Sequence, residues 1–569
     1  MSQHIVVIGG VALGPKAACR FKRLEPGSTV TMIDQSSLIS YGGCGIPYYV
    51  SGDVSDAREL CTTSFHMVRD AEFFKEVKGV DVRTLTKATK IDREKKLVHV
   101  EDVTNGETST IEYDKLVIAT GAAPRKLNLA GEDLEGVSYV CNPDDATRIR
   151  DGISKGEVSN AVIIGAGFIG LEMAEAFADM WGIPAAVVEI TDQIMSRLVS
   201  PTLATMAQKH MEESGVDFYF GETVQAIEGE DGHVKRVVTN KRTLDADAVI
   251  IAAGVVPNSW LAEEAGLDCA ERGGVMVDEF MRTNDPDIYS GGDCAIVKHL
   301  ITGDPFFLPL GSMANRQGRV IGSNLAGGET KFEGVVGSFV VKLFETSLAG
   351  SGLSLEAAAA SGFDAISVLL IQLDRAHFYP EKELMTLELV VEKETRRILG
   401  IQGFGSSGDA MVGRINSVAA TLKNKPTIDD LSNMEMAYSP PFAAAMDILN
   451  SLANLADNAL LGINRGVGPE GFKELWDQRD SGECHFLDCR EVGDASEFVE
   501  RNPEHWHNIP QGKINEHLDE IPKDKAVVLI CNTGARSYEA QIMLDEKGFS
   551  KVVNIQGGIA AIKKYGVDI

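Results

Sequence analysis

The sequence of 569 residues predicts an α/β protein of several domains. Single hydrophobic cores stop growing at about 250–300 residues, so this length indicates three or four domains. Two short β-branched runs are each followed by a glycine-rich turn, at residues 5–14 and 161–170. Each pattern is typical of the strand-to-helix opening of a nucleotide-binding βαβ unit. From about residue 332 the pattern changes to alternating strands and then helices, and the last hundred residues form another α/β unit.

Composition excludes several classes of partner and location. With 83 acidic and 54 basic side chains the formal charge is −29, which disfavours nucleic acid and anionic membranes as partners because of long-range repulsion. The nine cysteines lack metal-ligand spacing and form no disulfide framework, so we expect reduced thiols and no metal site. The chain begins without a signal-like segment and has no run approaching ~20 apolar residues. We therefore expect a cytoplasmic protein.

The first glycine loop, Gly-Gly-Val-Ala-Leu-Gly at residues 9–14, keeps the outer glycines of the G-x-G-x-x-G pattern and has Val11 at the middle position. Asp34 closes the second strand about 20 residues on, where a carboxylate accepts hydrogen bonds from ribose hydroxyls. The alternative is a plain strand and turn. The predicted contacts to this first dinucleotide are Gly9, Gly10, Ala12, Gly14 and Asp34.

The second glycine loop, at residues 165–170, has the complete pattern. The N-terminus of the helix that follows offers free backbone N–H groups and a positive dipole to a pyrophosphate. Glu189 ends the next strand, where its charge would accept from a 2′-hydroxyl and repel a 2′-phosphate, so NADH is favoured over NADPH. The predicted contacts are Gly165, Gly167, Phe168, Ile169, Gly170 and Glu189.

Two further segments, at residues 116–121 and 248–254, each combine an apolar strand with a glycine. They indicate strands by which the chain returns to a parent sheet after an inserted segment. One nucleotide domain is therefore interrupted by another. The predicted ranges are 1–150 and 251–325 for the first domain, 151–250 for the second, 326–455 for a third domain and 470–569 for a fourth. Residues 461–469 indicate a linker because glycine and proline break both regular periods, and helices are expected at residues 415–422 and 443–455.

The triplet Ala119-Thr120-Gly121 and the pair Gly292-Asp293 resemble FAD motifs of the pyridine nucleotide-disulfide oxidoreductases. The resemblance covers residues 1–325 and implies two Rossmann-like domains, the first binding FAD and the second NAD. It also implies that Asp293 contacts the ribityl or pyrophosphate portion of FAD.

The segment at residues 40–49 decides the reaction class. Disulfide reductases of this family have a second cysteine five residues after the first, and here that position is Tyr49. An unpaired Cys44 before a helix would exchange with external sulfur, whereas the alternative is a buried, inert thiol. The resemblance is to the single-cysteine branch, which includes coenzyme A-disulfide reductases, NADH-dependent persulfide reductases, and NADH oxidases or peroxidases. Peroxidases carry a histidine in the first glycine loop, which this chain lacks.

Arg20, Lys22 and Arg23 on the first helix resemble the basic residues that coenzyme A-dependent members use for nucleotide phosphates. Ser40 also matches the coenzyme A-type segment, but Gly43 stands where that segment usually has asparagine. The alternative for the three basic residues is a solvated helix face. The resemblance therefore implies coenzyme A as a further ligand.

Tyr379 and Tyr438 lie in the third domain and resemble the two interface tyrosines of the family. The resemblance implies an α+β dimerisation domain and a homodimer in which these hydroxyls reach the partner's cysteine and protonate a leaving thiolate. The alternative is two core tyrosines.

The segment at residues 531–537 follows a strand and precedes a helix. Such a loop turns backbone N–H groups toward one thiolate and stabilises a persulfide on it. Four residues separate Cys531 from Arg536, which resembles the rhodanese spacing rather than the five of cysteine phosphatases. The motifs at residues 487–491 and 556–559 extend the resemblance to the rhodanese domains.

The combined resemblance implies an FAD enzyme in which Cys44 attacks a persulfide or polysulfide, electrons from NADH reduce the sulfur-bonded cysteine, and Cys531 captures and delivers sulfane sulfur. Coenzyme A would act as acceptor or carrier near Cys44. Two alternatives stay open, a coenzyme A-disulfide reductase and a sulfurtransferase whose flavoprotein part senses redox state.

Overall fold

The computed structural model describes residues 2–406 and 408–569 and divides the chain into two compact units. Unit 1 comprises Met1–Ile190 and Gly221–Val335, and unit 2 comprises Thr191–Phe220 and Val336–Ile569. The predicted domain ranges are finer than this division and stay predictions. Within the described residues, no helix is both long and apolar enough to cross a membrane.

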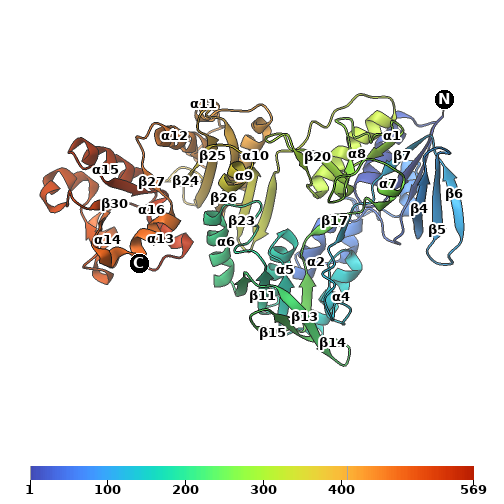
Figure 1. Ribbon diagram of the computed structural model, residues 1–569, viewed down its shortest axis with the longest axis horizontal. Helices are drawn as coiled ribbons and strands as arrows, with labels where there is room; N and C mark the ends of the chain where they lie inside the picture. The colour runs from blue at the N-terminus through green and yellow to red at the C-terminus, as the bar shows by residue number, and fades with distance from the viewer. Residues whose placement is uncertain (1, 407) are drawn as a thin grey trace. The chain divides into compact units, whose positions relative to one another are not determined.

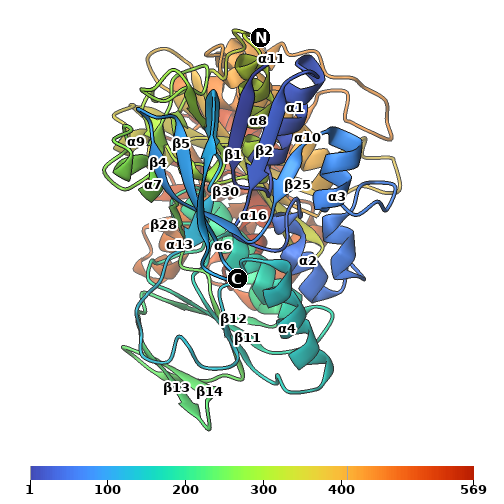
Figure 2. The ribbon, with the colours of Figure 1, turned by 90° about the vertical axis from the view of Figure 1, so that its right-hand side faces the viewer.

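The first sheet of unit 1 is parallel, with the strand order β19-β7-β1-β2-β3. Residues 5–7 are fully buried, because one face of the sheet packs on apolar residues of α1 and α8 and the other on apolar residues between positions 88–113 and 261–275. A strand that is buried on both faces becomes a nearly continuous apolar run. Helices α1 and α8 pack against each other beside β1 and β2 (Figure 2). The bounds are β1 His4–Ile8, β2 Thr29–Ile33, β3 Asp81–Arg83, β7 Lys115–Ile118, β19 Ile288–Ser290, α1 Leu13–Leu24 and α8 Gly311–Leu325.

A second parallel sheet of unit 1 has β11, β10, β16 and β9 as successive neighbours. The helix α5 follows β10 directly, which gives the predicted strand–loop–helix arrangement. The predicted return strand at residue 248, β16, pairs with β10, which precedes the second glycine loop. The predicted return strand at residue 116, β7, pairs with β1, which precedes the first glycine loop. The bounds are β9 Val137–Ser138, β10 Ala161–Ile164, α5 Phe168–Ala178, β11 Ala185–Glu189 and β16 Ala248–Ile251.

Two three-stranded antiparallel sheets and several short elements complete unit 1 (Figure 1). The antiparallel strands are β4 Thr86–Asp92, β5 Leu97–Asp102 and β6 Thr108–Glu112, then β13 Val224–Glu230, β14 His233–Thr239 and β15 Thr243–Asp245. The short helices are α2 Ile46–Ser51, α3 Ala71–Phe73, α4 Pro143–Ser154 and α7 Trp260–Glu264. The short strands are β8 Ala122–Pro124, β17 Val255–Pro257, β18 Val275–Met276, β20 Ala295–Lys298 and β21 Pro305–Phe306.

Unit 2 contains an antiparallel sheet with the order β22-β23-β26-β25-β24. Helix α10 packs on β23 and β26, and α12 packs on β24 and β25, so strands and helices form an α+β domain. The bounds are β22 Phe339–Leu343, β23 Thr346–Gly352, β24 Ala365–Leu373, β25 Leu384–Glu392, β26 Ile398–Gly405, α9 Leu355–Ala360, α10 Gly408–Leu422, α11 Ile428–Ser432 and α12 Ile448–Leu460. Unit 2 also holds α6 Pro201–Glu213 and β12 Val216–Phe220.

The C-terminal domain of unit 2 is a parallel sheet with the order β27-β31-β30-β28-β29. Apolar residues of α13, α14 and α16 form a core on one face, and those of α15 form a second core on the other, with helices on both sides in Figure 1. The bounds are β27 Gly466–Val467, β28 Cys484–Asp488, β29 Trp506–Asn508, β30 Ala526–Ile530, β31 Val552–Ile555, α13 Pro469–Asp477, α14 Val492–Arg501, α15 Ala535–Glu546 and α16 Gly558–Tyr565.

Two predicted elements of unit 2 differ from the structure. The helix expected from residue 443 begins at Ile448, because Asp447 caps it by accepting from the Leu449 N–H group. The expected linker at residues 461–469 contains β27, which pairs with β31, and its Pro469 is the first residue of α13. Proline suits the first helical position because that N–H group has no helical partner.

The C-terminal domain contacts the edge of the antiparallel sheet in unit 2. Strand β24 is an edge strand, and its Leu369 N–H group donates to the Gln556 side chain at 2.9 Å. The side chains of Leu369 and Ile371 lie beside Gly557, so that a Cβ there would come within 2.9 Å and 3.2 Å of them. The loop after β31 therefore covers the edge of β24.

Candidate functional site

The first glycine loop brings three chain segments of unit 1 together. Gly9 has a φ of +113°, and a Cβ at this position would lie 2.0 Å from the Ala119 carbonyl oxygen. A Cβ on Gly14 would lie 1.9 Å from the Gly9 carbonyl oxygen. The Gly10 N–H group donates to the Asp34 carboxylate at 2.7 Å. Only glycine permits this close packing. The cap residue of α1 is Ala12, which makes no side-chain hydrogen bond to the N-terminus of the helix.

These residues fit a bound dinucleotide. The first turn of α1 has uncapped N–H groups for a pyrophosphate, and Gly121 has open space around its Cβ position. Thr120 is held by its hydroxyl, which donates to the Asn258 carbonyl at 2.6 Å. Gly292 and Asp293 follow β19 at the same edge of the sheet, and burial raises the pKa of Asp293 to about 6. A ligand hydroxyl that donates to this carboxylate would favour its charged form.

The second glycine loop has a similar cradle with more open space. Gly165 has a φ of +110°, and a Cβ on Gly170 would lie 1.9 Å from its carbonyl oxygen. Gly167 caps α5 without a side-chain hydrogen bond, and nothing lies within 4 Å of its Cβ position. Phe168 and Ile169 begin α5, and the Glu189 carboxylate accepts from the Ala166 N–H group at 2.8 Å. The open space at Gly167 lets phosphate approach the helix N-terminus.

We predict that Glu189→Ala weakens the preference for NADH. The carboxylate lies at the loop, where it would bind a ribose hydroxyl and repel a 2′-phosphate. The ratio of kcat/KM for NADH to that for NADPH should fall by about tenfold or more, measured by steady-state oxidation of each nucleotide. Glu228→Ala on the β13 strand serves as the control, and an unchanged ratio in Glu189→Ala would contradict this role.

Cys44 is exposed and lies in the short helical turn Gly43–Gly45 that leads into α2. A Cβ on Gly311 would lie 3.5 Å from the Cys44 Sγ, so the thiol lies at the first residue of α8. The cap residue of this helix, Leu310, makes no side-chain hydrogen bond. Free N–H groups and the positive end of the dipole at a helix N-terminus favour a negative charge. The sulfur therefore lies beside the uncapped N-terminus of α8.

The neighbours of Cys44 fix the segment that carries it. The Ser40 N–H group donates to the Gly10 carbonyl at 2.8 Å, and Ser40 has a φ of +50° and is buried. Tyr49 is buried under the Arg150 guanidinium, which lies 4.5 Å from its ring centroid. The position of the second cysteine in two-cysteine enzymes is thus occupied by a packed aromatic ring. All nine cysteines, each of which the structure describes, are free thiols.

Glu172 was not among the predicted site residues. It lies in the first turns of α5, and its carboxylate accepts from the Tyr48 hydroxyl at 3.2 Å. Burial, with Glu175 nearby, raises the pKa of Glu172 to about 7. This hydrogen bond connects the segment that carries Cys44 to the helix of the second glycine loop. Its position directly after the loop pattern was the only signal in the sequence.

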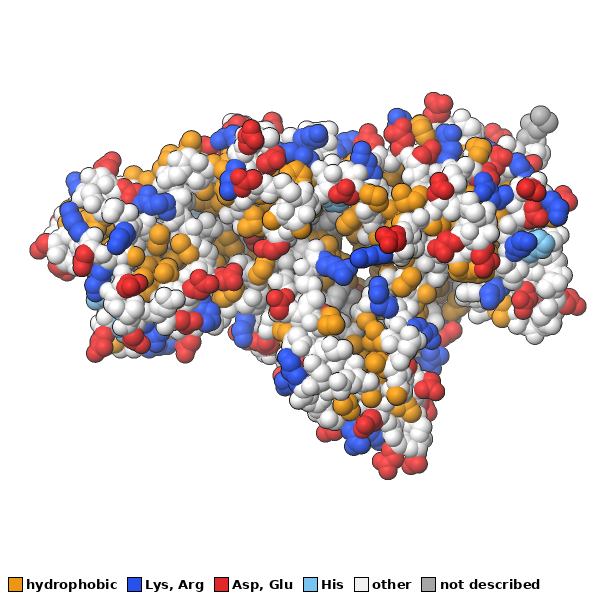
Figure 3. Space-filling view, viewed as in Figure 1, with side chains coloured by type: hydrophobic (Ala, Val, Ile, Leu, Met, Phe, Trp, Pro, Cys, Tyr) orange, Lys and Arg blue, Asp and Glu red, His pale blue; other side chains and the backbone are white. Residues whose placement is uncertain are grey.

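Among the basic residues of α1, Lys22 and Arg20 donate hydrogen bonds within the protein, whereas Arg23 is exposed. The Lys22 ammonium donates to the Pro26 and Ser28 carbonyls, and Arg20 donates to the Ser323 hydroxyl at 3.1 Å. Arg23 is exposed. Burial raises the pKa of the nearby Cys19, and the charges of Lys78, Arg23 and Lys16 partly offset this rise. Lys16, Arg20 and Arg23 have spacings of four and three residues, which place them on one helix face. Figure 3 shows that acidic and basic side chains are interspersed over much of the visible surface.

Two loops of unit 2 carry the predicted interface tyrosines. The Ala376 N–H group donates to the Pro440 carbonyl at 3.2 Å, which joins the loop of Tyr379 to the loop of Tyr438. The large apolar side chains Phe378, Tyr438, Phe442 and Met446 are 65%, 51%, 73% and 56% exposed. Such a cluster of exposed apolar side chains is typical of an interaction surface.

A buried ion pair anchors both tyrosine loops and was not predicted. The Arg414 guanidinium of α10 binds Asp447 at 2.8 Å, and the two side chains are 10% and 2% exposed. The same guanidinium donates to the carbonyls of Asp374 and Phe442 at 3.3 Å each. These residues are distant in sequence, so no local pattern indicated the pair.

Cys531 begins the loop between β30 and α15 and is 1% exposed. Its Sγ accepts from the Gly534 N–H group at 3.1 Å and lies 3.4 Å from the Ser537 hydroxyl. Gly534 has a φ of +104°, which glycine adopts without strain. Arg536 is half-buried in the first turn of α15. One backbone N–H group, rather than the expected series, donates to this sulfur.

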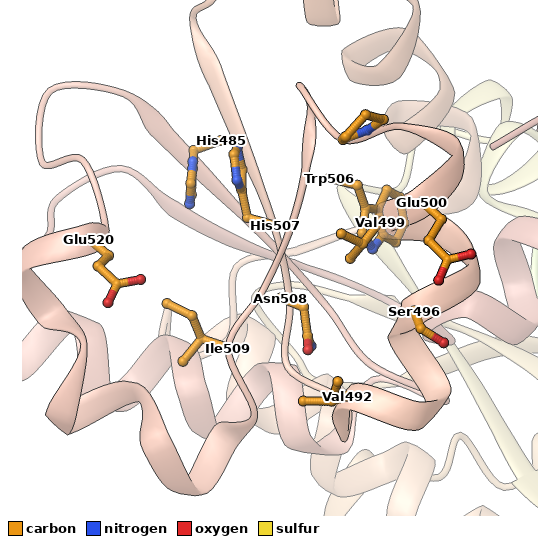
Figure 4. A pocket seen from close by; sticks show the side chains of 11 residues that line it. His485, Val492, Ser496, Val499, Glu500, Trp506, His507, Asn508, Ile509 and Glu520 are labelled. Carbon is orange, nitrogen blue, oxygen red and sulfur yellow. The ribbon is translucent and has the colours of Figure 1, made fainter.

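A hollow of about 480 Å³ lies elsewhere in the C-terminal domain (Figure 4). The rings of His485 and His507 stack within it, with centroids 4.2 Å apart and planes at 13°. Burial, then His507 and Lys525, lowers the pKa of His485 to about 4, and burial also lowers the pKa of His507. Neither Cys531 nor Arg536 lines this hollow.

We predict that acid destabilises the C-terminal domain through His485. The folded state keeps this histidine neutral, whereas the unfolded chain protonates it near its ordinary pKa, so stability falls as the pH falls from about 6.5 toward about 4. His485→Gln should reduce this fall, measured by hydrogen exchange of β28 amides at each pH. His517→Gln is the contrast, because Glu520 raises the pKa of His517. An unchanged acid profile in His485→Gln would contradict this assignment.

Comparison with known proteins identifies the family. The sequence model of the pyridine nucleotide-disulphide oxidoreductases matches residues 3–318. The chain belongs to this family. Its dimerisation domain matches residues 339–449, and a rhodanese-like domain matches residues 472–565. The predicted fold class is therefore confirmed. The prediction that the protein is a flavin-dependent NAD(P)H oxidoreductase is confirmed as well.

Three relatives show how far the similarity extends. The structure of a NAD-dependent persulfide reductase from A. fulgidus has a TM-score of 0.92 and 38% identity and covers 98% of this chain and 99% of its own. The structure of reduced Bacillus anthracis CoADR-RHD has a TM-score of 0.89 and 30% identity, covering 99% and 98%. An NAD(P)H coenzyme A polysulfide/persulfide reductase of Pyrococcus horikoshii is 35% identical over 455 residues, which are 80% of this chain and 98% of that protein.

Proposed function

We propose that this flavoenzyme uses NADH to reduce the sulfane sulfur of a persulfide or polysulfide at Cys44. The observation that carries the proposal is the exposed, unpartnered Cys44 thiol at the N-terminus of α8, in a chain that also has the Cys531 loop. Bound FAD supplies the two electrons that it receives from the nicotinamide. The names of the A. fulgidus and P. horikoshii relatives support a persulfide as substrate.

Each predicted residue has a role in this proposal. Cys44 attacks the sulfur–sulfur bond and holds the sulfur that is to be reduced. Its thiolate is stabilised by the N-terminus of α8. Cys531 captures sulfane sulfur in the loop where the Gly534 N–H group donates to its Sγ, and Arg536 of the same loop is proposed to assist this capture. Tyr379 and Tyr438 are proposed to act on the partner's cysteine in a homodimer, which the exposed apolar side chains around Tyr438 support.

The cofactor contacts follow the two glycine loops. FAD is proposed to bind at Gly9, Gly10, Ala12, Gly14, Asp34, Ala119, Thr120, Gly121, Gly292 and Asp293. NADH is proposed to bind at Gly165, Gly167, Phe168, Ile169, Gly170 and Glu189. The close packing at Gly14 and Gly170 and the open space at Gly167 support both sites. A cytoplasmic location stays a prediction.

Coenzyme A is the proposed carrier or acceptor near Cys44. The basic face with Arg20 and Arg23 supports a site for its phosphates, and Ser40 lies four residues before Cys44. Lys22 supports it less well, because its ammonium already binds two carbonyls. The name of the P. horikoshii relative, which includes coenzyme A, supports the same ligand.

The test is steady-state NADH oxidation under nitrogen with polysulfide, glutathione persulfide and coenzyme A disulfide in parallel. We expect sulfide release and higher kcat/KM with the first two. Faster turnover of coenzyme A disulfide would instead establish the second candidate, a coenzyme A-disulfide reductase. Sulfur transfer from thiosulfate that requires Cys531 but not NADH, with no reduction of any of these substrates, would indicate a sulfurtransferase.

A further inference from the structure

A second thiol lies beside Cys531 in the C-terminal domain. Strands β28 and β30 pair in parallel, with Asp488 opposite Ile530. The next residues are Cys489 and Cys531, and the Cys489 N–H group donates to the Ile530 carbonyl at 2.8 Å, so the pairing continues past both strand ends. Adjacent strands lie ~4.8 Å apart, which falls within the Cα separation of about 4.4–6.8 Å that a disulfide requires.

Both cysteines are buried in the C-terminal domain. Cys489 is 0% exposed and Cys531 is 1% exposed. Burial, then the neighbouring Cys531 and Asp488, raises the pKa of Cys489, which Arg536 partly offsets. Leu487 and Cys489 belong to the same core as Leu529, so the register of β28 and β30 places Cys489 and Cys531 at neighbouring positions of the sheet. By contrast, Cys484 of the same strand packs against the opposite core.

The main chain at both cysteines is fixed. The Cys489 carbonyl accepts from the Gln511 N–H group at 3.1 Å, and the Cys531 carbonyl accepts from the Ile559 N–H group at 2.8 Å. The Cys489 thiol makes only a weak contact with the Leu487 carbonyl at 3.8 Å, which a rotation of its side chain would break. The position of the Cys489 main chain is therefore set by the strand pair, and its side chain has no strong hydrogen bond that would oppose rotation.

We propose that Cys489 is a resolving thiol that discharges the persulfide on Cys531 as hydrogen sulfide and closes a Cys489–Cys531 disulfide. This inference rests on the proposed loading of Cys531 with sulfane sulfur. Cys489 attacks the Sγ of Cys531, the bond from Sγ to the outer sulfur breaks, and the leaving hydrosulfide takes the proton of Cys489. The two cysteine sulfurs are oxidised, and the sulfane sulfur is reduced to sulfide. Two low-molecular-weight thiols then reopen the disulfide and leave as their own disulfide.

The surroundings determine when this route operates. A protonated Cys489 is a weak nucleophile, so a persulfide on Cys531 persists while an external acceptor is present. Without an acceptor the internal thiol reacts, because it is held beside the persulfide and needs no encounter. Hydrosulfide is a better leaving group than an ordinary thiolate since it is the weaker base. The C-terminal domain would thus release sulfide without electrons from NADH.

The experiment loads the full chain with polysulfide in the Cys44→Ser background, without NADH, and removes excess reagent under nitrogen. Intact mass and peptide mapping then follow Cys531. We expect the mass of one added sulfur atom to disappear while one sulfide per loaded chain is released and a linked Cys489–Cys531 peptide forms. Cys489→Ser and Cys489→Val should keep the added sulfur and form no linked peptide. Cys484→Ser should behave as its parent.

The outcomes separate this inference from the proposed function. A loaded chain that keeps its sulfur and yields no linked peptide would overturn the resolving role of Cys489 and leave the sulfane-sulfur role of Cys531 intact. A chain that never gains sulfur on Cys531 would overturn both. Sulfide release at the same rate in Cys489→Val would also overturn the inference, because another group would then be the attacking nucleophile.

Discussion

Cys44→Ser should abolish NADH-dependent reduction of persulfide while the protein stays folded and yellow. A hydroxyl at this position neither attacks sulfur nor forms a thiolate at the N-terminus of α8, so the rate should fall on the order of 10³-fold or more. The measurement is anaerobic NADH oxidation with glutathione persulfide, with sulfide release measured in parallel. Bleaching of the flavin by NADH alone should persist, because that half of the reaction requires no thiol.

The matched control is Cys61→Ser. Cys61 is half-buried in the segment next to the Cys44 loop, and its neighbour Leu60 packs against Gly45. This variant tests whether loss of any nearby thiol has the same effect, and it should keep most of the wild-type rate. Persulfide reduction that survives in Cys44→Ser would refute the proposed mechanism.

Arg414→Leu should destabilise unit 2 by about 3–5 kcal/mol, since it leaves the buried Asp447 carboxylate without its partner. The carbonyls of Asp374 and Phe442 also lose their donor, so both tyrosine loops lose their common anchor. We expect a lower urea midpoint and, if these loops form the dimer interface, a shift toward monomer in sedimentation.

Arg396→Leu is the control for this substitution. Arg396 pairs with Asp429 and Asp457 near the surface, and such pairs contribute about 1 kcal/mol or less. Replacing Arg414 and Asp447 together by leucine should cost less than Arg414→Leu alone if the unpaired charge dominates. Equal losses in Arg414→Leu and Arg396→Leu would contradict the anchoring role.

The sequence allowed the local parts of the site to be predicted. Strand, glycine turn and helix are contiguous at residues 5–14, 161–170 and 527–537, so their pattern determines both the fold and the free N–H groups. The absence of a second cysteine at Tyr49 was equally visible. The same local rule places Glu189 at the last position of β11 and Asp34 directly after β2.

Features built from distant residues could not be predicted. The contact of Cys44 with the N-terminus of α8 at Gly311 depends on how β1, α1 and α8 pack. The Arg414–Asp447 pair depends on two loops that meet only in the fold. Strand β27 lies in the segment predicted as a linker, because glycine and proline break both regular periods there, and only its pairing with β31 makes it a strand.

The contact at Leu369 has a consequence for shortened forms of the chain. Without residues 464–569, the N–H group of Leu369 would lose the Gln556 oxygen, and the apolar side chains of Leu369 and Ile371 would lose the covering loop. An uncovered outermost strand is a template for pairing with another molecule. A truncated protein would thus tend to aggregate in solution.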